Sequence, residues 1–119
     1  MDAVKKERLT AAGIDVDDAL GRFMGNEALL ERFLTKFLAD GSYAALSAAV
    51  AAGDSAGALT ASHTLKGVCG NLSMSELFRL LTCQVEALRA DDWTRAAGLM
   101  PEIDRAYAAV VGAIGEAGR

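Results

Sequence analysis

Residues 54–72 of the chain read DSAGALTASHTLKGVCGNL, and they contain the clearest helical pattern in the sequence. Its small and apolar residues recur every three or four positions, which is the period of an amphipathic helix. Asp54 is a suitable N-cap, so the sequence predicts a helix from Asp54 to about Asn71. One side of that helix is apolar and is the expected buried face: Ala58, Ala61, Leu65, Val68, Cys69 and Leu72.

Amphipathic helices are also expected before this stretch. Apolar residues recur over residues 26–38, with charged residues on the other side, and the period continues over residues 43–50 after a break or a kink at Gly41. Two short helices are expected over about residues 3–24. The first half of the chain is therefore predicted to be helical as well.

The second half of the chain continues the pattern. Ser73 and Glu76 match the S-x-x-E pattern of a capping box, which predicts a helix ending near Ala90. In the last helix Pro101 lacks a backbone donor, so it must kink the helix or lie in a new first turn. Four long amphipathic segments joined by short turns favour antiparallel neighbours. We expect an all-α fold, an up-and-down antiparallel four-helix bundle with short N-terminal helices and a bundle core at about residues 26–116.

Composition limits the number of domains and the classes of partner. A chain of 119 residues predicts a single domain over residues 1–119. The net charge of -4 leaves no basic surface for nucleic acid. No apolar run approaches the roughly 20 residues that span a bilayer, and the polar start from Met1 to Arg8 lacks the apolar stretch of a signal peptide. We expect a cytoplasmic protein with no membrane partner, and a monomer.

His63, the only histidine, is expected to point away from the buried face of the 54–71 helix. Lys66 lies three positions further on, where its ammonium can reach a phosphoryl group on the ring. No Asp or Glu occurs between Asp54 and Glu76, so this face tolerates an anion but cannot hold Mg²⁺. An exposed imidazole is mostly neutral at pH 7, and its free ring nitrogen can attack phosphorus. Such a face needs a partner to supply the metal and the second reactant.

Two glycines lie one and two turns beyond His63 in the same helix. Each glycine inside a helix costs about 1 kcal/mol relative to alanine, so a reason for keeping it is expected. At Gly67 we favour open access for a partner's backbone and a bulky phosphoryl group over close helix packing. At Gly70 access, close packing and a frayed helix end all stay open.

Residues 63–67, HTLKG, match the H-x-L-K-G signature of histidine-containing phosphotransfer (HPt) domains. Four fixed positions should occur by chance in roughly one in a thousand chains of this length. The chain resembles that family over about residues 9–116. The resemblance implies that His63 is phosphorylated, that Lys66 stabilises the phosphate, and that Gly67 gives the partner room. Further residues expected at the partner interface are Leu59, Thr60, Gly70 and Asn71.

HPt domains exchange phosphoryl groups with the receiver domains of response regulators. The resemblance implies that receiver domains dock over His63 and the 26–38 helix, and that a sensor or hybrid histidine kinase is a further partner. It implies no cofactor of the chain's own, with Mg²⁺ in the partner receiver domain. The expected function is that of a phosphocarrier in a two-component phosphorelay, not an enzyme. One departure is Ser73, where many members have glycine, and the predicted capping box would give this serine a local role.

Other functions agree with only part of the sequence. A histidine kinase dimerisation domain usually has an acidic residue after its histidine, whereas Thr64 follows here, and the chain is too short to bind a nucleotide as well. A detached kinase-substrate domain of the chemotaxis type would belong to a longer protein, whereas Met1 and a complete bundle favour a stand-alone relay protein. The main alternative is an adaptor that binds receiver or kinase domains without being phosphorylated. A metal site is disfavoured, because Cys69 and Cys83 lack ligand spacing and are interpreted as core thiols.

Overall fold

The structure, a computed structural model, describes the backbone of residues 1–117 and the side chains of residues 1–115. This part of the chain consists of helices and turns, which confirms the all-α class. Its helices are α1 (Ala3–Ala11), α2 (Val16–Arg22), α3 (Glu27–Phe37), α4 (Ser42–Ala51), α5 (Ser55–Asn71), α6 (Ser75–Arg89), α7 (Trp93–Gly98) and α8 (Met100–Ala117).

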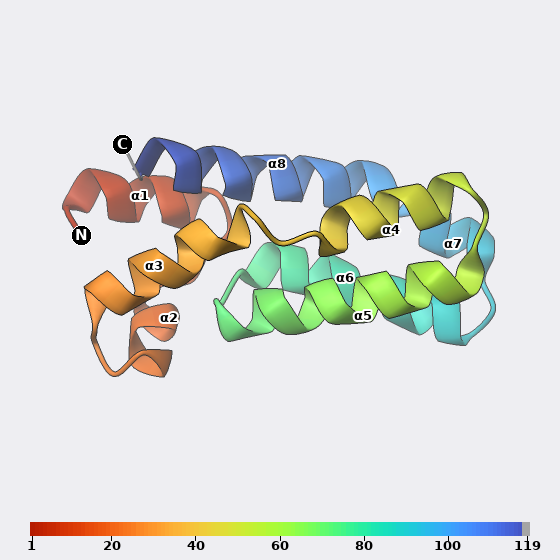
Figure 1. Cartoon of the computed structure of the whole chain (residues 1–119), viewed down its shortest axis with the longest axis horizontal. Coiled ribbons are helices and arrows are strands. Elements are labelled where there is room, and N and C mark those ends of the chain that lie inside the picture. Colours follow the sequence, from red (N-terminus) through yellow and green to blue (C-terminus); the bar gives the residue numbers. More distant parts are fainter. Residues whose placement is uncertain (118–119) are drawn as a thin grey trace.

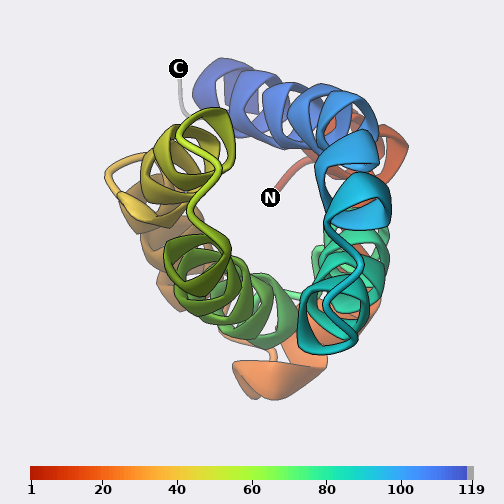
Figure 2. The same ribbon diagram turned by 90° about the vertical axis from the view of Figure 1, so that its right-hand side faces the viewer.

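The long helices run back and forth along the molecule, which measures 43 × 24 × 20 Å. α4 leads to one end, α5 returns beside it, and α6 runs out again beside α5 (Figure 1). α7 turns the chain at that end, and α8 returns the full length to pack against α6 and α1. Seen end-on, α4, α5, α6 and α8 surround a common centre (Figure 2).

Apolar side chains from most of the helices fill that centre. The aromatic rings of Tyr43 and Tyr107 stack with centroids 3.8 Å apart and join α4 to α8. Phe37 of α3 packs against Tyr107 as well. The largest fully buried side chains are Leu9, Ile14, Leu30, Phe37, Leu46, Leu65, Met74, Leu77, Leu81, Gln84, Val85 and Ile103.

No helix in the described part of the chain has the length and apolarity needed to cross a membrane.

The helix bounds answer two questions that the sequence left open, at Gly41 and at Pro101. The chain breaks fully between α3 and α4, so the feature near Gly41 is a turn and not a kink. Pro101 is the second residue of α8, in a new first turn, where its missing N–H leaves no helical bond unmade. The apolar side of residues 26–38 is wider than the core: Leu34 and Phe37 are buried, whereas Phe33 is 41% exposed. That excess apolar surface lies near the site described below.

The predicted capping box is wrong. The residue that precedes α6 as its N-cap is Met74, and the Glu76 carboxylate pairs with Arg79 at 2.6 Å. Ser73 instead has a left-handed backbone (φ 53°), and its N–H donates to the Gly70 carbonyl, so that it ends α5. Its hydroxyl donates to the Asp18 carboxylate at 2.5 Å, which ties α2 to this turn. A left-handed backbone favours glycine, so serine is an unusual residue at this position.

Candidate functional site

The residues predicted to be functional lie along the exposed side of α5. The Asp54 carboxylate accepts a hydrogen bond from the backbone N–H of Gly57 at 2.9 Å and begins the helix as predicted. The expected buried face is confirmed, since five of its six residues are buried and the sixth, Val68, is half-buried. His63 is exposed, as the helical period required.

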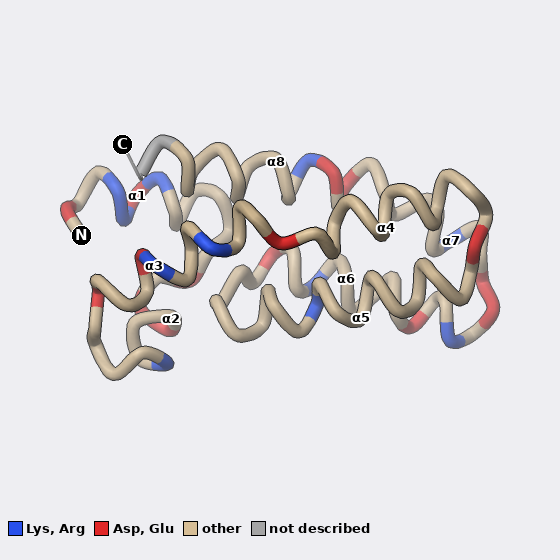
Figure 3. Tube along the Cα trace, in the orientation of Figure 1, with Lys and Arg blue, Asp and Glu red and all other residues tan. Residues whose placement is uncertain are grey.

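The imidazole of His63 is open to a partner. It is exposed and makes no hydrogen bond within the described part of the chain, so neither ring nitrogen is engaged there. Lys66 is the one charged residue of α5, and the tube in Figure 3 shows a single blue segment on this helix. The face therefore has a free nucleophile and one cation, with no carboxylate on its own helix to repel an anion.

Lys66 does not extend freely into solvent. It is half-buried, and its Nζ lies 5.7 Å from the centroid of the Phe78 ring, on α6. This distance is within the range of a cation–π contact. Among the described residues no carboxylate pairs with Lys66. The ammonium is thus held on the α6 side of His63 without an ion pair to a described residue.

Gly67 and Gly70 have different surroundings. A Cβ atom built at Gly67 would meet nothing within 4 Å, so the space above this residue is open. A Cβ atom built at Gly70 would lie 3.1 Å from Cε2 of Phe78. The structure therefore supplies a packing reason for Gly70, whereas at Gly67 it leaves the room that access requires.

A buried polar network lies directly behind the site. The Ser62 hydroxyl donates to Oε1 of Gln84 at 2.8 Å, and both side chains are fully buried. Nε2 of Gln84 donates in turn to the Ala96 carbonyl at 3.1 Å and lies 3.2 Å from Sδ of Met100. These bonds fix the register of α5 against α6 and α7, because a slip would leave buried polar groups unpaired. They hold the backbone at His63 in place.

A groove runs beside α5 on the side away from Phe78. It is lined by residues of α2, α3 and the second half of α5: Arg22, Phe23, Phe33, Lys36, Phe37, Asp40, Val68, Asn71 and Leu72. The rings of Phe23 and Phe33 contact each other with centroids 5.2 Å apart, and Nζ of Lys36 lies 5.4 Å from the Phe33 centroid. An apolar floor with charged side chains at its edge, here Arg22, Lys36 and Asp40, is typical of a protein-binding surface.

The remaining predicted interface residues lie along the same helix. Asn71 is exposed at the edge of the groove. Thr60 is exposed beside α4, with its hydroxyl donated to the Ala56 carbonyl at 3.2 Å, and Leu59 is half-buried. The structure places them next to the exposed face, and their contact with a partner stays a prediction.

Sequence reasoning missed the aromatic residues around α5. Phe78 lies one position after the buried Leu77 and is 37% exposed. Phe23 closes α2 and meets Phe33 from a helix that starts four residues later. The usable signal was a large apolar residue just outside a helical stripe, which marks either a wider core or a surface for a partner.

The cysteines and the acids form no second chemical site in the described part of the chain. No group of three or more His, Cys, Asp or Glu side chains there could hold a metal ion. Cys69 and Cys83 are free thiols, and burial raises the pKa of the Cys69 thiol to about 12. A thiol with such a pKa stays protonated and inert at neutral pH.

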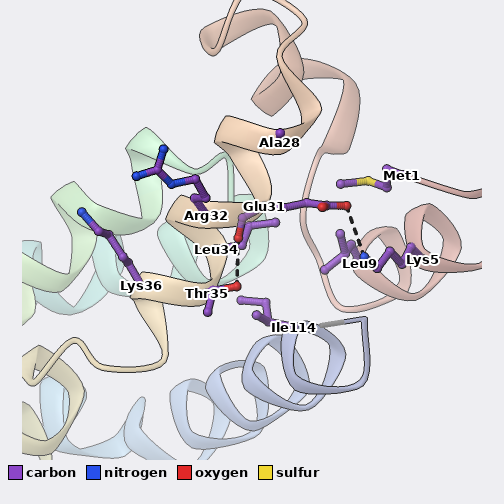
Figure 4. Close-up of a pocket in the computed structure, with 10 residues that line it drawn as sticks. All are labelled: Met1, Lys5, Leu9, Ala28, Glu31, Arg32, Leu34, Thr35, Lys36 and Ile114. Carbon is purple, nitrogen blue, oxygen red and sulfur yellow. Dashed lines mark hydrogen bonds and ion pairs between the residues drawn. The ribbon is translucent and has the colours of Figure 1, made fainter. Parts of the chain in front are cut away.

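A hollow far from His63 lies between α1, α3 and α8. Figure 4 shows its lining, in which Leu9, Leu34 and Ile114 form an apolar floor. The ammonium of Lys5 is already paired with the Glu31 carboxylate at 3.2 Å. Arg32 and Lys36 extend away from the hollow (Figure 4). Among the described residues that line it, the charged groups are therefore paired or extend away, and the Thr35 hydroxyl donates to the Glu31 carbonyl at 2.9 Å.

Comparison with family models, curated proteins and solved structures finds no match for this chain.

Proposed function

We propose that this chain is a histidine phosphotransfer protein that accepts a phosphoryl group on His63 and passes it to a receiver domain. The observation that supports this is one exposed helical face that combines three features. It has an unbonded imidazole at His63, an ammonium three residues further on at Lys66, and open space above Gly67. A buried network behind the face keeps it rigid, which transfer between two proteins requires.

The transfer step needs no oxidant or reductant. A ring nitrogen of His63 bonds to the phosphorus of an aspartyl phosphate, the P–O bond to the aspartate breaks, and the carboxylate leaves with the electron pair. The reverse step returns the phosphoryl group to a second receiver's aspartate. Lys66 offsets the negative charge that arrives. Because the face has no carboxylate ligands, the Mg²⁺ for this step belongs to the partner receiver domain.

The arrangement of the helices supports the finer fold that this function needs. We assign the chain to an up-and-down antiparallel four-helix bundle. Its first helical segment is α3 together with α4, and the other three are α5, α6 and α8. The short helices α1 and α2 are attached to it, and the chain forms a single HPt domain. The alternating directions of α4, α5, α6 and α8 in Figure 1 agree with this assignment. In such a bundle every helix has an outer side, and α5 can present its own to a partner.

The receiver domain should dock over α5 and the neighbouring groove of α2 and α3. Phe23 and Phe33 would supply apolar contact area, and Lys36 lies where it can meet an acidic surface. A receiver's active site, with aspartates around Mg²⁺, presents such a surface. This mode of docking covers Gly67 and Asn71, which are both exposed. A sensor or hybrid histidine kinase is the proposed source of the phosphoryl groups, and the chain is proposed to be a cytoplasmic, monomeric phosphocarrier and not an enzyme.

The test is phosphoryl transfer to the wild type and to a His63→Gln variant. The purified chain is incubated with Mg²⁺ and a panel of receiver domains phosphorylated with radiolabelled phosphate. Acid-labile, alkali-stable label on the wild type alone is the expected result. Label on both chains would place the phosphoryl group elsewhere and contradict the proposal.

A second candidate function is a non-phosphorylated adaptor, because the groove at Phe23 and Phe33 does not include His63. If no receiver labels the wild type but one of them binds it, and binds His63→Gln equally well, the adaptor function should replace the phosphocarrier.

A further inference from the structure

Phe78 is a large aromatic residue that the core does not require. Leu77, one position before it, and Leu80, two positions after it, are buried and fill the core side of α6 at this level. Phe78 itself is 37% exposed and lies in the first turn of the helix. Its backbone N–H donates to the Met74 carbonyl at 2.9 Å. Its carbonyl accepts the Thr82 hydroxyl at 2.8 Å, so the backbone under the ring is fixed.

The ring lies directly against the backbone of α5. A Cβ atom at Gly70 would be 3.1 Å from Cε2 and 3.3 Å from Cδ2 of the ring, which is tighter than ordinary contact. Any residue with a side chain would therefore push the ring outward. The absence of a side chain at Gly70 lets the ring approach α5 at the turn that follows Lys66.

The same ring receives the ammonium of Lys66, whose Nζ lies 5.7 Å from the ring centroid. A lysine side chain has four rotatable bonds and would otherwise occupy many conformations on the surface. No ion pair among the described residues restrains it. Lys66 lies three positions after His63, which places it about 60° around the helix and about 4.5 Å along it. The ring thus restrains the ammonium within reach of a group bound to the imidazole.

We infer that Phe78 is a positioning residue for phosphoryl transfer. Its ring, seated on Gly70, holds the Lys66 ammonium on the α6 side of His63, where it meets the incoming phosphoryl group. The inference rests on the proposed function of His63 and adds to it a part for α6. The cation–π contact is weak enough to be released, so the ammonium can move from the ring to the phosphoryl oxygens.

Phosphoramidate, a small phosphoryl donor, tests this role without an identified partner. A ring nitrogen of His63 bonds to phosphorus, the P–N bond of phosphoramidate breaks, and ammonia leaves. The labelling rate is compared among the wild type, Phe78→Leu, Phe78→Tyr, Lys66→Ala and the Lys66→Ala/Phe78→Leu double variant. Leucine keeps the apolar bulk but lacks the ring, whereas tyrosine keeps the ring. Far-UV circular dichroism of each variant confirms the helical fold.

The expected result is coupling between the two positions. Phe78→Leu should slow labelling about two- to fivefold, the range of an exposed cation–π contact. Phe78→Tyr should be labelled at the wild-type rate, because tyrosine keeps the ring. In the Lys66→Ala background the leucine substitution should change nothing further. An equal slowing by Phe78→Leu in both backgrounds would overturn the inference, because the ring would then act independently of the lysine.

A spectroscopic measurement separates this inference from the proposed function. The ε-methylene protons of Lys66 should resonate upfield of an ordinary lysine in the wild type and in Phe78→Tyr, because the ring current shields them. The shift should disappear in Phe78→Leu. An unshifted Lys66 in a wild type that is labelled on His63 would overturn the inference alone. A shifted Lys66 with no label on His63 from any donor would overturn the proposed function and leave the contact without a part in transfer.

Discussion

Ser62 and His63 are neighbours in the chain, yet they lie on two sides of α5 that differ in nearly every contact. The Ser62 side is buried, and its hydroxyl is bonded to a glutamine whose own amide is bonded in turn. On the His63 side the imidazole is unbonded within the described chain, and Gly67 has open space above it. The polar groups on the Ser62 side are hydrogen-bonded within the molecule, whereas the imidazole on the other side has no such partner among the described residues. Changes on the buried side should therefore alter stability, and changes on the exposed side should alter transfer.

The largest effect on the exposed side is expected from Gly67→Phe. A phenyl ring one turn beyond His63 would occupy the space through which a receiver approaches, so transfer from a phosphorylated receiver should fall about a hundredfold or more. The helix should stay folded, because no side chain and no atom of another helix lies within 4 Å of the new Cβ. Rapid-quench kinetics with a labelled receiver gives the rate.

A matched measurement shows whether Gly67→Phe acts by exclusion of a protein. Phosphoramidate is small and needs no docking surface, so its reaction with His63 should be slowed far less than transfer from a receiver. Equal slowing with both donors would mean that the substitution disturbs the imidazole itself, and the separation of the two sides would not hold in this form.

On the buried side, Ser62→Ala tests stability. The substitution removes the donor to Oε1 of Gln84 and leaves that oxygen buried without its partner. A loss of about 1–3 kcal/mol in the free energy of unfolding is expected from such an orphaned group. Urea denaturation measures it. Thr64→Ala is the matched control, because the Thr64 hydroxyl also donates within α5, to the Thr60 carbonyl at 2.9 Å, but is exposed. A change within about 0.5 kcal/mol is expected for that control.

A smaller effect, on the stability of α5, distinguishes the half-buried Gly70 from the exposed Gly67. Gly67→Ala should stabilise the helix by about 0.5–1 kcal/mol, since alanine is the better helix former and its methyl group meets nothing. Gly70→Ala should gain about 0.5–1.5 kcal/mol less, because the Phe78 ring must shift by a few tenths of an ångström to admit its methyl group. Urea midpoints compare the two. Equal gains would show that the ring moves aside at no cost, which would also weaken its part in holding Lys66.

Periodicity predicted the helices well because burial decides their faces. The bounds of α5, its Asp54 cap and the exposure of His63 all followed from the spacing of apolar residues. The same reasoning could not separate the buried Leu34 from the exposed Phe33, since both belong to one apolar stripe and only the neighbouring helices decide how wide the core is. The motif at residues 63–67 pointed to the face but not to what restrains Lys66, because Phe78 is twelve residues away on another helix.

The predicted capping box shows how two local signals can compete. Ser73 and Glu76 have the spacing of such a box, but Ser73 is needed to end α5 with a left-handed backbone, and a residue in that conformation cannot also be the N-cap of α6. Its hydroxyl donates to the Asp18 carboxylate and accepts from Arg22, both on α2 and more than 50 positions away in the chain. Single-sequence reasoning has no access to a contact of that range.

The last and smallest effect concerns this turn, through Ser73→Gly and Ser73→Ala. Both remove the hydroxyl, but only glycine relieves the left-handed strain, so the glycine variant should be more stable than the alanine variant by about 1 kcal/mol. The Ser73 hydroxyl, and after it Arg22, lowers the pKa of the Asp18 carboxyl. A lowered pKa means that the unfolded chain binds the proton more tightly, so this stabilisation is fully present above about pH 4 and is lost as the pH falls through the folded pKa. Urea midpoints from pH 7 to pH 3 should show the wild type and Ser73→Ala converging on acidification. A gap that stays constant over that range would mean that the hydroxyl supports the turn without acting on Asp18.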